Sequence, residues 1–373
     1  MKLEDIKAGS SPSFLRNPYL EWAAGECVPV IEDFGVDLLA LEMKPWPRFG
    51  VDGAIVHLKG RGDFISVFVQ QLLPGGKSAP QRHLYEQVVT VLSGHGSTTV
   101  HTASGSAQTF EWGPGSLFAL PLNVTYRHFN GSGSEPARLS VTNNLCIMMN
   151  LFRNEDFIFS ADYDFVSDSL AARDFSGDGE FVPAPRGRFM WETNFVPDLN
   201  AVELISDDKR GAGSATLAFV LADVGMHAHC AQMPVGTYKK AHRHGPDYHV
   251  MILDGEGYSL LWYQNDSERV RIDWARGWMF APPDQMYHQH FNTCVRPVRY
   301  MATALGNSRY PFTERNRQGK LGVDVSVKEG GLQIEFEDQD PEIHQMYVQA
   351  LAKSGVECRM APFGAGPAKK KAS

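Results

Sequence analysis

The stretch of sequence that decides the fold lies between Pro234 and Trp262 and reads PVGTYKKAHRHGPDYHVMILDGEGYSLLW. It contains His242, His244 and His249, three of the 13 histidines in a chain of 373 residues. Alternate residues of a strand face the same side, so we expect His242 and His244 to point together into a barrel. Two imidazoles at this spacing form part of a metal site, although a lone His-x-His is more often a pair of polar residues facing solvent.

A second stretch of the chain resembles the first. It begins at Pro74 and reads PGGKSAPQRHLYEQVVTVLSGHGSTTV. His83 precedes Gly94 by eleven residues, as His244 precedes Gly255. Each stretch is followed by another matched piece, GSLFALPLNVTYRHFNGS from residue 115 and GWMFAPPDQMYHQHFNTC from residue 277. A repeat of about 160 residues is too long for a solenoid unit and predicts two tandem copies of one domain.

Short β-type runs separated by Gly, Pro and Asn turns cover most of the chain, among them DFISVFVQQLL, EQVVTVLSG and YHVMILDG. This spacing predicts an all-β barrel or sandwich. The best helical signal is DPEIHQMYVQALAKSG at 340–355, which has an acidic start and a glycine at its end. Hydrophobic residues make up 43% of the chain, enough for real cores.

Charge and cysteine usage exclude several classes of protein. The formal net charge of -8 argues against nucleic acid as a partner, because phosphate contacts need clustered Lys and Arg. No apolar run reaches the roughly 18 residues of a membrane span. The five cysteines form no Cys-x-x-Cys pair, and the first residues lack the apolar core of a signal peptide. We therefore expect a cytoplasmic protein without membrane partners.

The two histidine-containing pieces resemble the motifs of the cupin family, Gly-x5-His-x-His-x3-Glu-x6-Gly and Gly-x5-Pro-x-Gly-x2-His-x3-Asn. The chain departs from them at Tyr248, where Glu is expected, and at Gln285, where Gly is expected. The resemblance implies an all-β bicupin, with two tandem double-stranded β-helix (jelly-roll) barrels and short helical termini and connector. The matching positions are Gly236, His242, His244, Gly255, Gly277, Pro283, His288 and Asn292.

On this basis we expect five segments. They are an N-terminal arm at 1–50, an N-terminal cupin at 51–150, a connector at 151–200, a C-terminal cupin with the metal site at 201–312, and an extension with one helix at 313–373. The N-terminal cupin is degenerate, because one histidine does not make a metal site. It has Gln81, His83, Gln87 and Tyr126 where the second copy has His242, His244, Tyr248 and His288. We expect His83 to be a hydrogen-bonded interior residue.

The cupin resemblance implies that His242, His244 and His288 hold a divalent metal, unless the site has decayed and its histidines only hydrogen-bond. Three neutral imidazoles leave the charge of the ion unneutralised, which suits a substrate with anionic oxygens. Tyr248 would fill space, hydrogen-bond the substrate, or ligate as phenolate. His249 is one residue out of register and should face outward, unless a bulge brings it in as an extra ligand.

The second half further resembles gentisate 1,2-dioxygenase and its salicylate-cleaving relatives. The resemblance lies in His-Arg-His, in the missing Glu ligand, and in the segment His288-Gln289-His290-Phe291-Asn292. It implies an Fe(II)-dependent, extradiol-type dioxygenase, with Mn, Ni or Zn as other metals, that opens an ortho-hydroxy or ortho-amino aromatic acid with O2. We expect a homo-oligomer, a dimer or tetramer. Those enzymes typically keep their metal in the N-terminal cupin, so the substrate does not carry over.

Within that resemblance His290 is the catalytic candidate, as a pocket residue that hydrogen-bonds substrate or moves a proton, with a purely structural role as the alternative. Lys240 has the parity of His242 and is expected to attract a carboxylate. Other substrate-binding candidates are Tyr238, Tyr248, Trp262 and Tyr287, although aromatic residues are more often core. A second His-x-His, at His227 and His229, is a weaker metal candidate.

Two other functions remain open. One is a metal-dependent cupin lyase or isomerase acting on a small acid or sugar. The other is a non-catalytic ligand-binding bicupin.

Overall fold

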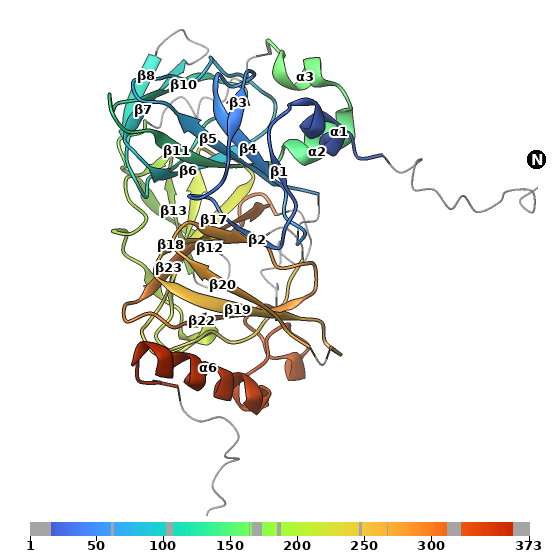
Figure 1. The fold of residues 1–373 in the computed structure, drawn as a ribbon, viewed down its shortest axis with the longest axis vertical. Coiled ribbons are helices and arrows are strands. Elements are labelled where there is room, and N and C mark those ends of the chain that lie inside the picture. The colour runs from blue at the N-terminus through green and yellow to red at the C-terminus, as the bar shows by residue number, and fades with distance from the viewer. Residues whose placement is uncertain are drawn as a thin grey trace, which may run out of the picture.

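The computed structural model describes residues 16–60, 63–101, 107–163, 165, 174–184, 188–245, 248–266, 268–311 and 322–360. Its strands form four sheets, two in each of two barrels. The barrels are stacked on one another, with α1, α2 and α3 beside the first barrel and α6 across the far end of the second (Figure 1).

The first barrel has an eight-stranded sheet and a three-stranded sheet. The large sheet contains β1 (Val30–Ile31), β3 (Lys44–Trp46), β4 (Val51–Val56), β5 (Ser66–Leu72), β6 (Gln87–Ser93), β9 (Leu117–Ala119), β11 (Ala137–Asn143) and β14 (Phe195–Val196). The small sheet contains β7 (Gly96–His101), β8 (Ala107–Trp112) and β10 (Thr125–Asn130).

The second barrel repeats this plan with a nine-stranded sheet and a three-stranded sheet. The large sheet contains β2 (Gly35–Asp37), β12 (Glu180–Ala184), β13 (Arg188–Thr193), β15 (Ile205–Ser206), β16 (Ala215–Leu221), β17 (Met226–Met233), β18 (His249–Asp254), β21 (Trp278–Phe280) and β23 (Val298–Leu305). The small sheet contains β19 (Glu256–Trp262), β20 (Val270–Ala275) and β22 (Tyr287–Asn292).

The helices among the described residues are short. They are α1 (Pro18–Gly25), α2 (Leu145–Phe152), α3 (Glu155–Phe159) and α6 (Pro341–Ser354), with 3-10 turns η4 (Asp208–Arg210), η5 (Val327–Glu329) and η6 (Phe336–Asp338). The side chain of Asp340 caps α6 by accepting from the Glu342 N–H, and Gly355 ends the helix in a left-handed conformation. No helix among the described residues is long and apolar enough to cross a membrane.

The two barrels exchange strands. β2 precedes the first barrel in the chain but pairs with β21 of the second, in the register Val36–Met279. β14 follows the first barrel and pairs back onto β9, in the register Phe195–Phe118. The segments before and after the first barrel are therefore built into sheets and are not free linkers.

The barrels pack through their large sheets. One buried apolar cluster joins Val67 and Val88 of the first barrel to Phe219, Ala228 and Met301 of the second. Within it the Thr303 hydroxyl lies 3.4 Å from the Thr142 hydroxyl. The second barrel therefore packs on the first barrel on the side opposite α6 (Figure 1).

The internal repeat is visible in matched side-chain roles. The Asn130 amide donates to the carbonyls of Leu72, Leu73 and Glu135. In the second barrel the Asn292 amide donates in the same way to the carbonyls of Met233, Pro234 and Arg296. This asparagine therefore closes the end of the barrel and has a structural role in both copies.

In both copies the position of the second motif's glycine holds another residue, and that residue has a left-handed backbone conformation. Gln285 has a φ of 59° and Asn123, at the matching place, has a φ of 58°. This left-handed conformation is costly for residues other than glycine, although Asn tolerates it better than Gln. The Gln285 N–H also donates to the carbonyl of His244 at 3.0 Å, so this turn supports a candidate ligand.

We expect Gln285→Gly to raise the free energy of unfolding by about 0.5–1 kcal/mol, because relief of the left-handed strain exceeds the entropy that glycine loses on folding. Urea denaturation of the variant and wild type measures the difference. Asn123→Gly is the matched control. It should destabilise, because the Asn123 amide donates to the carbonyls of Ala161 and Tyr163. A destabilised Gln285→Gly protein would contradict this account of the turn.

Candidate metal centre

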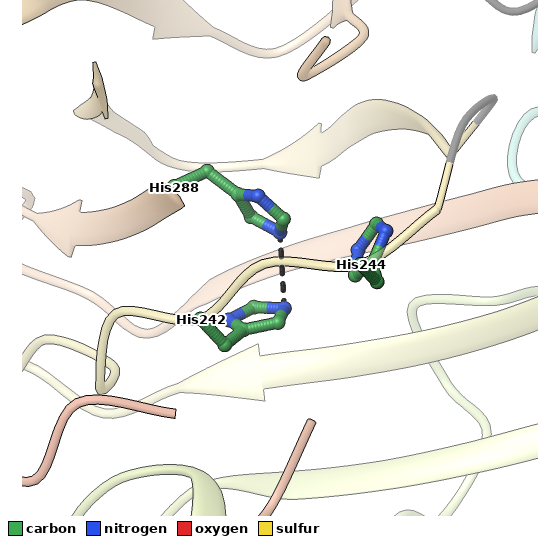
Figure 2. A group of neighbouring side chains, drawn as sticks. All are labelled: His242, His244 and His288. Atoms are coloured by element: carbon green, nitrogen blue, oxygen red, sulfur yellow. Dashed lines mark hydrogen bonds between the residues drawn. The ribbon is translucent and has the colours of Figure 1, made fainter. Parts of the chain in front are cut away.

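His242, His244 and His288 come together inside the second barrel, although 46 residues separate the first from the last. His288 lies on β22, and His242 forms an antiparallel bridge with it from the segment before β18. His244 lies two residues further along the same segment. Figure 2 shows the three rings turned toward one another.

The three rings are close enough to share one ion. The Nε2 atoms of His242 and His288 are 3.0 Å apart. One ligand atom from each of the three residues lies within 4.8 Å of the others. Two nitrogens bound at about 2.1 Å and at right angles around a metal would be about 3.0 Å apart. The observed separation therefore fits two adjacent ligands of one ion.

Hydrogen bonds set which nitrogen faces inward in two of the three rings. The Nδ1 atom of His288 lies 3.2 Å from the Met286 carbonyl, and that of His244 lies 2.8 Å from the Gly245 carbonyl. A carbonyl accepts, so each Nδ1 carries the proton and each Nε2 keeps a lone pair. This is the tautomer that metal ligation through Nε2 requires.

Burial keeps the rings neutral. Desolvation lowers the pKa of His244 to about 4 and lowers those of His242 and His288 well below the usual value. Nearby Arg210 and the other histidines lower the pKa of His242 further. Neutral imidazole is the form that binds metal, so the group is ready to ligate near pH 7.

Arg210 stands against this group. Its Nη2 donates to the Nε2 of His242 at 2.6 Å, and its Nη1 contacts the Val323 carbonyl. A single lone pair cannot both accept this hydrogen bond and bind a metal, so ligation by His242 through Nε2 requires the guanidinium to turn away. The Nη2 donors would then be available to an anion beside the metal.

These residues line a cavity of about 380 Å³. The three candidate ligands share it with His290, Tyr248 and Lys239, and with the apolar side chains of Phe189, Met190, Val250 and Ala302. A cavity of this size suits a small organic molecule.

His227 and His229, on β17, also line the cavity. The Nε2 of His227 lies 2.8 Å from the Nδ1 of His229, and burial lowers the pKa of His227 to about 4. They are not part of the three-residue group. The sequence marked them only as a weaker metal candidate. Their part-buried positions alternate with buried neighbours along β17, which places them on the inner face.

A bulge explains why Lys239, and not Lys240, reaches the cavity. Tyr238 pairs with Phe291, and His242 pairs with His288. Between these two bridges the chain advances by four residues on the Tyr238 side but by only three on β22. The extra residue reverses the inward and outward alternation between Lys239 and His242. Lys240, which simple alternation places with His242, instead forms an ion pair with Glu335 outside the cavity wall.

The same reversal places Tyr238 on the outer side. Its hydroxyl accepts from the Gln339 amide at 3.0 Å and lies 3.1 Å from the Nδ1 of His344 on α6. Trp262 stacks on Tyr287 in this outer layer. None of the three aromatic residues borders the cavity. The structure thus places these sequence candidates in the core beneath α6.

Tyr248 and His249 have different surroundings. The Tyr248 ring lies on the cavity wall with its centroid 4.3 Å from that of His244. Burial raises the pKa of its phenol. His249 begins β18, is completely buried, and is outside the three-histidine group and the cavity wall. His249 thus faces away from the cavity, as alternation along the strand predicts, and it is buried because the large sheet packs on the first barrel.

His290 lies in the cavity wall two residues beyond His288. Its Nδ1 lies 2.8 Å from the Ser259 hydroxyl, which accepts from the Trp274 indole N–H at 2.9 Å. The first barrel contains the same chain of contacts, with Thr98 bonding both His128 and Trp112. The hydrogen-bond chain is thus an element of the repeat, and any chemistry of His290 must come from its position beside the candidate ligands.

The first barrel offers no such group in the part of the chain that the structure describes. His83 is buried and stacks on Tyr85, with ring centroids 3.5 Å apart. Its Nδ1 lies 2.9 Å from the Tyr85 carbonyl, and its Nε2 lies 3.0 Å from the hydroxyl of Tyr126, which stands where His288 stands in the second barrel. His83 is therefore a hydrogen-bonded interior residue, as the sequence predicts.

Comparisons with known proteins support the fold. No family model matches the chain, and no curated protein matches it. Among solved structures, an oxalate decarboxylase matches with a TM-score of 0.50 and 11% identity, covering 89% of this chain and 88% of that one. A Bacillus subtilis oxalate decarboxylase, whose Mn(II) centres were characterised, matches with a TM-score of 0.49, 11% identity, and coverage of 89% and 88%.

Vicilin from Corylus avellana (hazelnut) is similar with a TM-score of 0.43 and 11% identity, over 65% of this chain and 76% of that one. At such identities a likeness shows the fold alone. Together with the paired sheets, the match at 0.50 shows that the chain has the bicupin fold. The finer resemblance to gentisate 1,2-dioxygenase is not shown by these neighbours.

We expect one metal ion per chain, in the second barrel. His242→Ala or His288→Ala should reduce metal content to near zero, because two imidazoles do not retain an ion that three hold. His83→Ala is the control and should keep the metal. Elemental analysis of the purified proteins measures the ratio. Two ions per chain, or full metal content in His288→Ala, would show that the site is wrongly placed.

We expect Tyr248→Phe to keep the metal. Burial raises the pKa of this phenol, so the side chain stays protonated and is a poor ligand. Phenylalanine preserves the ring contact with His244. Metal content and the visible spectrum of the Fe(III) form report the outcome. An intense absorption band that disappears in the variant would identify Tyr248 as a phenolate ligand and refute this expectation.

Proposed function

We propose that the second barrel is the active site of a divalent-metal enzyme that acts on a small carboxylic acid. The observation that carries the proposal is the group of His242, His244 and His288. Its rings are neutral and lie at the wall of a cavity, and one ligand atom from each residue lies within 4.8 Å of the others. Such a group holds an ion without neutralising it, so the bound ion attracts an anionic substrate.

The surroundings of the group favour a carboxylate. Arg210 places guanidinium donors beside His242, and Lys239 places an ammonium on the same cavity wall. Asp207 is the one acidic side chain on that wall among the described residues. Guanidinium recognises carboxylate with paired hydrogen bonds, so Arg210 is the residue that we assign to the substrate's acid group.

The apolar wall favours an aromatic acid over a very small one. Phe189, Met190, Val250 and Ala302 offer contact surface that a two-carbon acid would leave unused. We therefore propose oxygen-dependent ring opening of an ortho-hydroxy or ortho-amino aromatic acid. Both atoms of O2 enter the product, and the ring bond between the carboxylate-bearing carbon and its oxygen- or nitrogen-bearing neighbour breaks.

The metal, proposed to be Fe(II), supplies Lewis-acid and one-electron chemistry when it is bound. The chain's residues supply position and proton control. His290 is held by Ser259, and burial lowers its pKa, so the ring is neutral. Its place on the cavity wall beside His288 positions it to hydrogen-bond a substrate hydroxyl and to relay that proton. His242, His288 and His290 are buried, so these side chains have little contact with bulk water.

The second candidate is a lyase acting on a small acid without O2. The enzymes named in the comparisons are oxalate decarboxylases, which belong to this class, and no ring-cleaving enzyme is among them. Arg210 would serve a carboxylate in either reaction. Net consumption of O2 separates the two candidates, because ring opening incorporates O2 into the product whereas a lyase reaction balances without it.

We expect iron-loaded protein to consume O2 with at least one member of a panel of hydroxybenzoates, aminobenzoates and hydroxynaphthoates. His290→Ala should then lower turnover by about 10²–10⁴-fold with unchanged metal content, as loss of a general base does. His128→Ala is the matched control in the first barrel. It breaks the same hydrogen-bond chain and should leave turnover within a few-fold of wild type.

Absence of O2 uptake with every acid would refute ring opening. Conversion of an acid under nitrogen would establish the lyase. Full metal content without conversion of any acid would identify a binding protein. Equal losses in His290→Ala and His128→Ala would show that His290 acts only through the barrel structure.

A further inference from the structure

Lys239 is a buried cation without an acidic partner. Its side chain is only 4% exposed and lies on the cavity wall. Its ammonium forms no ion pair with any described residue, and it lies over the Tyr300 ring, 5.0 Å from Nζ to the ring centroid. Lysine is rarely buried unless it is paired, because removing the charge from water is costly. An anion from outside the chain would complete this site.

The internal repeat supports a role in binding over a role in folding. The Lys239 N–H donates to the His290 carbonyl at 3.0 Å, and the Ser78 N–H donates to the His128 carbonyl at 2.9 Å. Ser78 is thus the counterpart of Lys239 in the first barrel, which has the same bulge between the Lys77–Phe129 and Gln81–Tyr126 bridges. The barrel without the histidine group therefore folds with a small neutral residue at this place.

The ammonium is separated from the three-histidine group by the position of His290 on β22. Lys239 is next to His290 in the backbone pairing, and His290 is two residues from His288 on β22. Two residues along a strand correspond to about 7 Å. Ring centroids follow the same path, 5.5 Å from His288 to His290 and 5.6 Å from His290 to Tyr300. A two-carbon diacid is too short to reach both places, whereas an aromatic ring is a suitable spacer.

We propose that Lys239 binds a second carboxylate of the substrate, so that the cavity takes an aromatic dicarboxylic acid. This inference rests on the proposed function of the histidine group. The first carboxylate lies at the histidines and Arg210, the ring lies against the apolar wall, and the remote carboxylate pairs with Lys239. The contact decides which ring acids are accepted, and Lys239 takes no part in bond making or breaking.

The test compares the binding of one-carboxylate and two-carboxylate acids to Zn(II)-loaded protein by calorimetry, which needs no turnover. The probes are salicylate and its derivatives with a second carboxylate at ring position 3, 4, 5 or 6. At least one derivative should bind wild type about 10-fold more tightly than salicylate, the strength of one charge-assisted hydrogen bond. If none does, the inference is refuted without any variant.

Lys239→Met and Lys239→Gln should abolish that advantage, measured in each variant as the ratio of the dicarboxylate affinity to the salicylate affinity. Met keeps the length and Gln keeps a polar end, so agreement between them excludes a packing effect. Lys240→Met is the matched control, because that neighbouring lysine pairs with Glu335 outside the cavity, and it should keep the advantage. Loss in Lys240→Met, or an unchanged advantage in both Lys239 variants, would overturn the assignment.

The reaction is judged separately. A dicarboxylate advantage that depends on Lys239, in protein that shows no O2 uptake, would uphold this inference and reject ring opening. O2 uptake with salicylate-type acids and no dicarboxylate advantage would do the reverse.

Discussion

The backbone bridge between His242 and His288 is the contact on which the candidate metal centre depends. Each residue donates its N–H to the other's carbonyl, at 3.2 and 2.9 Å, and this pair holds the two Nε2 atoms 3.0 Å apart. A side chain has rotational freedom, but two side chains on a fixed bridge inside a packed barrel have little. The ligand separation thus follows from strand pairing, with His244 added by the turn that Gln285 supports.

The same barrel frame is used twice with different interiors. The asparagine that closes the barrel end, the Trp–Thr/Ser–His chain and the bulge occur in both copies. In the first barrel Tyr126 fills the place of His288 and bonds His83. That barrel contributes its large sheet as a base for the second, and the exchanged strands β2 and β14 tie the two together.

The wall of the second barrel's cavity has more positively charged than negatively charged side chains. Three neutral imidazoles, Arg210 and Lys239 face a cavity whose wall holds a single acidic side chain among the described residues. A divalent ion would add to this positive charge. Such an arrangement has a high cost unless an anion enters, and this cost supports the anionic substrate that we propose. The apolar wall then restricts the anion's shape.

The sequence by itself predicted two tandem all-β domains and placed the histidine group in the second, and its resemblance to the cupin motifs implied the bicupin fold. Turn glycines, period-two apolar runs and the spacing of His242, His244 and His288 can be recognised in the sequence without knowledge of tertiary contacts. Tertiary structure alone decided which neighbours reach the cavity. The bulge turns Lys239 inward and Lys240 outward. A bulge is defined by the pairing of two strands, so the inward and outward alternation predicted from one strand's sequence cannot reveal it. Arg210 and His227 come from other segments, and only the closing of the barrel brings them to the site.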